Sequence, residues 1–330
     1  MAGADLPASP RKASGDTPSG DTPSGDTPSM TASTTGRIVV IGDLMTDVIT
    51  HVDDPLAMGS DTVASISTRQ GGAGGNVAAW LAALGQPVSL VARVGDDPFG
   101  REAVQLLDSA GVRTRVGVDP AARTGTCVVL VGRDGERTML PDAGANSTLS
   151  VTDIPLHELR EASHVHVSGY TLLNPGSREA GQVALATARQ AGVATSVDAA
   201  SAAPLEAVGA GEFLRLTQDG DLLFATLDEA EVLCDARDPD VVRARLTAHF
   251  AQVVLKLGPD GACWCDRAAR DATCVPAARP GGEVVDSTGA GDAFAAAFLA
   301  ATVRGESVAT ALARACALAA RVVTQSGARP

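Results

Sequence analysis

The chain has 330 residues and a formal net charge of −13, with 45% hydrophobic and 20% charged residues. This length and hydrophobic content suit one large α/β domain or two smaller ones, and they exclude a wholly disordered polymer. The acidic balance argues against nucleic acid or an anionic membrane as the main partner, because both reward clustered Lys and Arg. A phosphate-bearing small ligand stays compatible, since it needs only a local site.

Residues 1–35 are predicted to be a disordered tail ahead of one folded domain of residues 36–330. The repeat SGDTP occurs three times between Ser14 and Pro28, and Gly, Pro, Ser and Thr dominate. Such a segment buries too little apolar area to fold. No apolar run reaches the ~18 residues of a membrane span, and the first residues lack an apolar signal core. We therefore expect a cytoplasmic protein.

From Arg37 onward, strand-like and helix-like segments alternate. RIVVIGD (37–43) is typical of a buried strand, and residues 71–85 read as a Gly-rich turn that enters a helix. A strand pattern over 87–95 and an amphipathic helix over 100–111 follow. Further strand-like runs, with helical patterns between them, occupy 164–169, 194–200, 221–226 and 253–258. This alternation predicts an α/β fold of three layers, α/β/α, with a mostly parallel sheet.

Two segments break this rhythm. Residues 52–70 and 122–141 alternate like strands, and the second contains the hairpin signal Arg133-Asp134-Gly135. We expect them to form a small β-sheet that serves as a lid beside the main domain.

The six cysteines are scattered, and Cys263-Trp264-Cys265 is a C-x-C rather than the C-x-x-C of a zinc or redox site. We expect buried free thiols in a reducing compartment. Lys256 is the only lysine of the expected domain, because the other lysine, Lys12, lies in the tail.

The stretch DSTGAGDAFAAAFLA, Asp286 to Ala300, places Gly289-Ala290-Gly291-Asp292 where a helix begins. Small residues let a ligand approach the backbone, and the free N–H groups of a first helical turn attract anions. Asp292 either stabilises the helix start or accepts a proton beside a bound phosphate. The pattern favours phosphoryl transfer. No G-x-x-x-x-G-K-[ST] motif and no protein-kinase motif set is present.

Taken together, the chain resembles the PfkB, or ribokinase-like, family of small-molecule kinases. Gly71–Asn76 (GGAGGN) is similar to the family's N-terminal Gly-Gly motif, and Asp286–Phe294 matches its C-terminal motif. Between them lie, in the family's order, ARVGDDPFG (92–100), Gly144-Ala145-Asn146 and LKLGPDG (255–261). The resemblance covers roughly residues 37–328. It implies a ribokinase-like fold and an ATP-dependent kinase of a sugar or sugar-like alcohol.

The resemblance also implies a role for each matching residue. Asp292 would be the general base, with the backbone N–H groups of Gly289, Ala290 and Gly291 as an anion hole. The acceptor would be bound by Asp47, Gly72 and Asn76. Without the resemblance, Asp47 would read as a loop acid and Asn76 as a helix N-cap. The residues implied at the ATP site are Lys256, Gly258, Gly261 and Thr288.

Two metal sites follow from the resemblance as well. Glu229 is expected to hold Mg²⁺, directly or through water, although Thr226 stands where the family has Asn. Asp286 and Gly327 match positions near which relatives hold a monovalent cation such as K⁺. The resemblance and the exposed edges of a small sheet also suggest a homodimer formed through the lid.

The identity of the acceptor stays open. Met45 and Ala73 replace a polar amide and a Lys of ribokinases, which argues against ribose itself and against a phosphorylated acceptor. The acceptor pocket could be lined by His164, His166 and Tyr170. For the two histidines, the alternative is packing within a strand. Alternatives are a nucleoside kinase, which the 3% aromatic content disfavours, and a catalytically weak ligand-sensing relative, which Asp292 disfavours.

Overall fold

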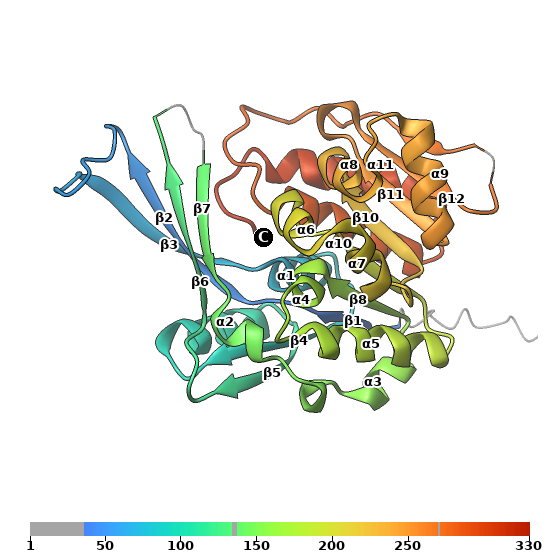
Figure 1. Ribbon diagram of the computed structural model, residues 1–330, viewed down its shortest axis with the longest axis horizontal. Coiled ribbons are helices and arrows are strands. Elements are labelled where there is room, and N and C mark those ends of the chain that lie inside the picture. The colour runs from blue at the N-terminus through green and yellow to red at the C-terminus, as the bar shows by residue number, and fades with distance from the viewer. Residues whose placement is uncertain (1–35, 134–136, 270) are drawn as a thin grey trace, which may run out of the picture. The chain divides into compact units, whose positions relative to one another are not determined.

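A computed structural model describes residues 36–133, 137–269 and 271–330. The predicted tail of residues 1–35 lies outside the described residues, as do Asp134 and Gly135 of the predicted hairpin turn. The described strands form two separate sheets, one large and one small (Figure 1).

The large sheet has nine of the described strands, in the order β13-β12-β11-β10-β9-β8-β1-β4-β5. The seven from β11 to β5 run parallel, and β12 and β13 are antiparallel at one edge. Their bounds are β1 Ile38–Ile41, β4 Val88–Gly95, β5 Arg113–Asp119, β8 His164–Ser168, β9 Thr195–Asp198, β10 Leu222–Thr226, β11 Gln252–Lys256, β12 Ala262–Asp266 and β13 Thr273–Val275. The inner strands are almost entirely buried and most are apolar, as expected for a parallel sheet that is covered on both faces. The predicted mostly parallel α/β fold is confirmed.

Helices cover both faces of this sheet. On one face the core packs against α1 Ala73–Ala83, α2 Pro98–Ser109, α10 Ala290–Val303 and α11 Val308–Val322. On the other face it packs against α3 Leu156–Glu161, α4 Gly169–Leu173, α5 Arg178–Gln190, α6 Ala202–Val208, α7 Ala210–Leu216, α8 Leu227–Cys234 and α9 Pro239–His249. Short 3₁₀ turns are η1 Gly144–Thr148, η2 Val151–Asp153 and η3 Gly258–Asp260. None of the described helices combines the length and apolarity that a membrane span requires.

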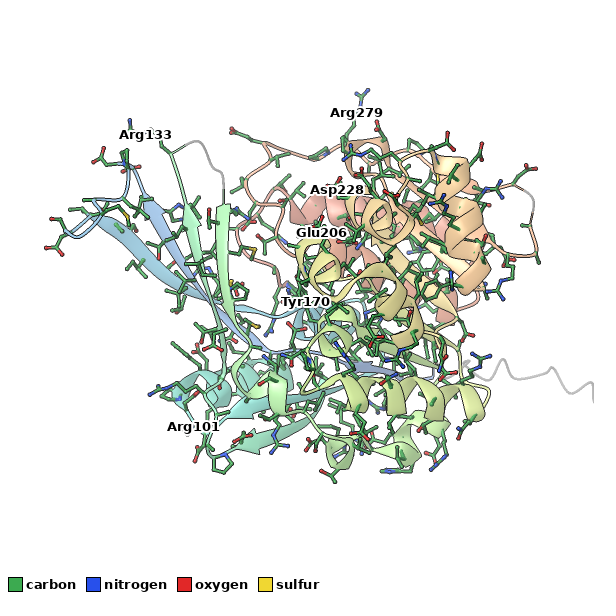
Figure 2. All side chains as sticks on the ribbon, in the orientation of Figure 1. Arg101, Arg133, Tyr170, Glu206, Asp228 and Arg279 are labelled. Atoms are coloured by element: carbon green, nitrogen blue, oxygen red, sulfur yellow. A yellow bond between two sulfur atoms is a disulfide. The ribbon has the colours of Figure 1, made fainter. Side chains whose placement is uncertain are left out.

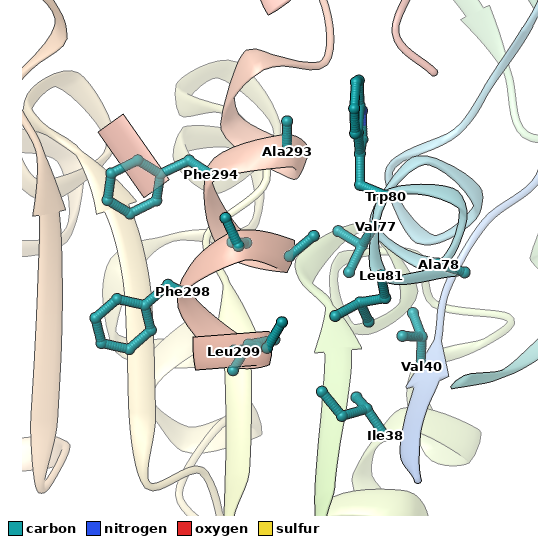
Figure 3. Packing of buried hydrophobic residues seen from close by; sticks show 14 of the residues in the cluster. Ile38, Val40, Val77, Ala78, Trp80, Leu81, Ala293, Phe294, Phe298 and Leu299 are labelled. Carbon is teal, nitrogen blue, oxygen red and sulfur yellow. The ribbon is translucent and has the colours of Figure 1, made fainter. Parts of the chain in front are cut away.

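The contact between α1 and α10 has the most direct bearing on function. Both helices are almost entirely apolar, and Figure 3 shows Val77 and Leu81 of α1 facing α10. Phe298 of α10 points the other way, where its ring meets Phe224 edge-on at a centroid distance of 5.5 Å. Because this packing is apolar and close, the first turns of α1 and α10 are held at a fixed separation.

The small sheet has the strand order β3-β2-β6-β7. Its bounds are β2 Met45–Val52, β3 Ala64–Gly71, β6 Gly125–Val131 and β7 Arg137–Asp142. The predicted start of the first lid segment, at residue 52, was wrong, because β2 already begins at Met45. The chain leaves β1 at Ile41 and enters the small sheet after a three-residue turn. That turn is fixed by Asn146, whose amide accepts from the Leu44 N–H (2.9 Å) and donates to the Leu44 carbonyl (2.8 Å).

The expectation that all cysteines are free was wrong. Cys263 in β12 and Cys274 in β13 form a disulfide. The antiparallel register places these two residues directly opposite each other, a relation that the spacing of a C-x-C motif cannot reveal. Cys127, Cys234, Cys265 and Cys316 are free and buried, as predicted.

Candidate active site

Asp292 lies in the first turn of α10, at the carboxyl end of the large sheet. Its Oδ2 accepts a hydrogen bond from Asn76 Nδ2 at 2.8 Å, across 216 residues of sequence. Burial raises the pKa of Asp292 to about 7, although the Asn76 hydrogen bond acts to lower it. A carboxylate with a pKa near neutrality is suited to accept a proton during a reaction.

Asn76 is the fourth residue of α1, so the alternative that it caps the helix is wrong; Gly72 is the N-cap. Gly72 adopts a φ of 88°, and an added Cβ would come within 2.6 Å of the Asp43 carbonyl, so only glycine fits there. The Asp43 carboxylate accepts from the N–H groups of Ala73 (3.1 Å) and Gly74 (3.3 Å). Asp43 thereby fixes the start of α1 and, with it, the position of Asn76.

Asp47 lies in β2 and is 9% exposed, rather than in a loop. Burial raises its pKa to about 6, while the positive charge of Arg329 acts to lower it. Sequence reasoning missed Arg329, which follows α11 and has no motif around it. Figure 1 marks the end of the chain between the small sheet and the large one, and Arg329 Nε donates to Asn76 Oδ1 at 3.0 Å.

Gly289, Ala290 and Gly291 form the turn that enters α10. Gly289 is the N-cap with a φ of 76°, and an added Cβ would lie 2.5 Å from Ala328 Cβ. The Ala290 N–H donates to the Ser287 carbonyl at 3.2 Å. An added Cβ at Gly291 would lie 3.4 Å from Lys256 Nζ. Backbone N–H groups at a helix start and one lysine therefore converge beside Asp292, an arrangement that suits an anion.

Lys256 lies at the end of β11, where its Nζ donates to Asp198 Oδ2 at 2.9 Å. Both side chains are largely buried, at 12% and 15% exposure. Burial disfavours the charged form of Lys256, but Asp198 and Glu229 outweigh it and raise its pKa. Asp198, at the end of β9, is the second residue that sequence reasoning missed. The parallel sheet brings the ends of β9 and β11 to one edge.

Glu229 is the third residue of α8 and forms a capping box with the N-cap residue Thr226. Its Oε2 accepts from the Thr226 N–H (2.8 Å), and its own N–H donates to Thr226 Oγ1 (3.3 Å). Burial raises the pKa of Glu229. Within residues 36–133, 137–269 and 271–330, no group of three His, Cys, Asp or Glu side chains could hold a metal ion. Mg²⁺ in nucleotide sites usually takes one or two carboxylates, with phosphates and water as its other ligands. Glu229 therefore fits a nucleotide-borne Mg²⁺.

The expected site of the monovalent cation is already paired. Asp286 Oδ1 accepts from the guanidinium of Arg137 in β7 and from the Thr288 N–H (2.8 Å), and Oδ2 accepts from the Gly327 N–H at 3.2 Å. Burial acts to raise the pKa of Asp286, but these donors outweigh it and lower it. Arg137 also donates to Thr288 Oγ1. A bound monovalent cation does not fit this arrangement, because the Asp286 oxygens already accept from Arg137, Thr288 and Gly327.

Gly258 is the first residue of η3 and Gly261 follows its last, with φ values of 58° and 103°. An added Cβ at Gly261 would collide with the Val275 carbonyl, so packing against β13 already requires glycine there. An added Cβ at Gly258 would meet nothing within 4 Å. Gly258 thus leaves open space on the surface expected to bind ATP.

His164 and His166 do not line a pocket. Both are buried and bond to Ser196 Oγ, at 2.7 and 2.8 Å. Burial lowers their pKa values to about 3 and about 4, so both are neutral at pH 7. Tyr170, labelled in Figure 2, is 39% exposed, and its pKa is raised by burial and by carboxylates that include Asp292. The histidines therefore pack within the sheet, whereas Tyr170 is partly exposed and lies within the electrostatic influence of Asp292.

The fold and the residues gathered at the start of α10 define an α/β protein with a large, mostly parallel sheet and a second, small sheet. The chain belongs to the pfkB family carbohydrate kinases, whose family model matches residues 35–330. It is 33% identical over 298 residues to an ATP-dependent ribose-1-phosphate kinase of Halopiger xanaduensis, covering 89% of this chain and 94% of that one. It is 29% identical over 314 residues to the probable fructokinase-5 of Arabidopsis thaliana, covering 90% and 94%.

Among solved structures, the adenosine kinase of Sinorhizobium meliloti has a similar fold. Its TM-score is 0.82 at 25% identity, covering 90% of this chain and 96% of that chain. The protein is thus a sugar kinase of the PfkB family, a phosphotransferase with an alcohol group as acceptor.

Proposed function

We propose that this protein uses ATP to phosphorylate a hydroxyl of a sugar or sugar-like small molecule, with Asp292 as the general base. One observation carries the proposal. Asp292, with a pKa raised by burial to about 7, stands at a helix start that can bind an anion. The same site then offers a proton acceptor and a phosphate cradle a few ångströms apart.

In the proposed reaction, the acceptor hydroxyl oxygen bonds to the γ-phosphorus of ATP, and its proton moves to the Asp292 carboxylate. The bond between the γ-phosphorus and the bridging oxygen breaks, and ADP leaves. The negative charge on the transferring phosphoryl group is stabilised by hydrogen bonds from the N–H groups of Gly289, Ala290 and Gly291. The N–H of Ala290 must first give up its contact with Ser287.

Lys256 is proposed to stabilise the phosphates of ATP, since its Nζ lies next to Gly291 and is kept charged by Asp198. Gly258, Gly261 and Thr288 would complete the nucleotide site. Glu229 would hold Mg²⁺, directly or through water, and the ion would neutralise phosphate charge. No monovalent cation has a role in this proposal.

The acceptor is proposed to lie between Asp47, Gly72 and Asn76, where a carboxylate and an amide can bind paired sugar hydroxyls. The named substrates of relatives include a sugar phosphate and a nucleoside, as well as fructose-type sugars. A cytoplasmic location and a homodimer through the small sheet remain predictions; exposed Ile66, Met139 and Leu140 on that sheet support the latter.

The experiment is ATP turnover, with Mg²⁺ present, against free sugars, sugar phosphates, sugar acids and nucleosides. We expect turnover with one class of sugar and its loss in Asp292→Asn. Turnover restricted to nucleosides would favour the nucleoside kinase. If ATP binds but no acceptor is turned over, the protein is better described as a ligand sensor.

A further inference from the structure

Arg329 contacts the Gly71–Asn76 segment of the candidate acceptor site without belonging to any motif. Its Nε donates to Asn76 Oδ1 at 3.0 Å, and its Nη2 donates to the Gly71 carbonyl at 2.6 Å. Burial lowers its pKa to about 10, while Asp47, Asp43 and Asp292 act to keep it charged. The guanidinium is therefore charged at neutral pH and held among acidic groups.

Three other contacts fix the segment that carries Arg329. Trp80 Nε1 on α1 donates to the Ala328 carbonyl at 2.8 Å. Ala328 also packs against Gly289, where a side chain would collide with it. An added Cβ at Gly75 would collide with Arg329 Nη2. Glycine at position 75 thus has a physical reason, since it admits the guanidinium against α1.

The hydrogen bonds that link Arg329 to Asn76 and Asn76 to Asp292 can run in only one direction. Arginine offers only donors, so the Asn76 atom that faces Nε must be the amide oxygen. The amide nitrogen of Asn76 must then face Asp292, to which it donates at 2.8 Å. If Asn76 turned over, its oxygen would face the Asp292 carboxylate, a repulsion that only a proton on that carboxylate could relieve.

We propose that Arg329 is a positioning residue of this kinase, which holds the Asn76 amide in the orientation that donates to Asp292. This inference rests on the proposed role of Asp292 as base. Arg329 fixes the amide, the amide keeps the base ionised, and the second N–H of Asn76 stays free for an acceptor hydroxyl. The C-terminal segment thereby acts on the reaction through α1.

Three substitutions separate hydrogen bonding from charge. Arg329→Gln keeps a donor nitrogen at the same distance from the backbone as Nε but removes the charge. Arg329→Lys keeps the charge but puts a methylene where Nε was. Arg329→Met removes both. Arg321→Met is the matched control, because Arg321 lies over the Trp80 ring, 5.5 Å from its centroid, and its side chain is not hydrogen-bonded to Asn76, Gly71 or Asp292.

The first readout needs no acceptor. In enzyme labelled with ¹³Cγ-aspartate, the Asp292 signal is identified by its absence in Asp292→Asn, and its pKa is followed by NMR titration. We expect Arg329→Met to raise the pKa of Asp292, Arg329→Gln to leave it near the wild-type value, and Arg321→Met to leave it unchanged.

The second readout is the pH profile of kcat, with the fastest acceptor of the turnover panel. Arg329→Met should lower kcat about tenfold at pH 7, in line with couplings between hydrogen-bonded neighbours. Arg329→Gln should keep kcat within about threefold. Gly75→Ala, which displaces the guanidinium, should resemble Arg329→Met, and the two changes together should cost no more than either alone.

Two outcomes would overturn the inference. An unchanged Asp292 pKa with a raised acceptor KM in Arg329→Met would make Arg329 an acceptor ligand instead. Equal losses in Arg329→Met and Arg321→Met, with lowered melting temperatures and no pH shift, would make its role structural. Wild-type turnover by Asp292→Asn would instead refute the proposed function itself, so the two failures are distinguishable.

Discussion

The proposed role of Asp292 as general base predicts that the rate of this kinase depends on pH in a defined direction. A general base must be ionised to accept a proton, and burial raises the pKa of Asp292 to about 7. About half of the enzyme is then active at pH 7, roughly 10% at pH 6 and roughly 1% at pH 5. Activity is therefore present above pH 7 and lost as the pH falls through it.

The assay is kcat/KM for the sugar acceptor between pH 5 and 9, at constant ionic strength and with Mg²⁺. We expect a slope of about one decade per pH unit below pH 7. Asp292→Asn should lower kcat by about 10²–10⁴-fold at pH 8. Its melting temperature should stay close to that of the wild type, because an asparagine oxygen can still accept from Asn76 Nδ2.

Asp228→Asn is the matched control for this substitution. Asp228 lies on α8 with its side chain 80% exposed, and it is labelled in Figure 2. It should keep the wild-type rate and profile. A profile that stays flat from pH 7 to pH 5, in an enzyme that remains folded, would refute Asp292 as the base with this pKa.

Three further predictions follow from the same contacts. Lys256→Met should raise the KM for ATP and lower kcat by about 10²-fold or more in steady-state kinetics; an unchanged KM for ATP would remove Lys256 from the nucleotide site. Gly289→Ala should lower the melting temperature more than Gly305→Ala. Both glycines have a φ of 76°, which costs about 1–2 kcal/mol for alanine, but only at Gly289 would the Cβ meet Ala328. Replacing K⁺ by tetramethylammonium should leave the wild-type rate unchanged because Arg137 already pairs with Asp286; K⁺ activation of severalfold would contradict this.

Local sequence determined the layered fold and much of the site. The alternation of apolar runs and amphipathic segments is a short-range property, and it predicted the parallel sheet with helices on both faces. The glycines of the two motifs have local reasons as well: Gly72 and Gly289 both adopt positive φ at a helix start. Asp292 could be singled out because its chemistry conflicts with its place beside an anion site.

Tertiary structure alone decided which side chains meet. The order β11-β10-β9 joins Lys256 to Asp198, and the packing of α10 on α1 joins Asp292 to Asn76. No local pattern encodes a sheet order, because each pair is separated by whole βα units. The Cys263–Cys274 disulfide depends on the register of two strands. The position of Arg329 depends on the path of the chain after its last helix. That path is set by the contact of Trp80 with Ala328 and by the space that Gly75 and Gly289 leave free.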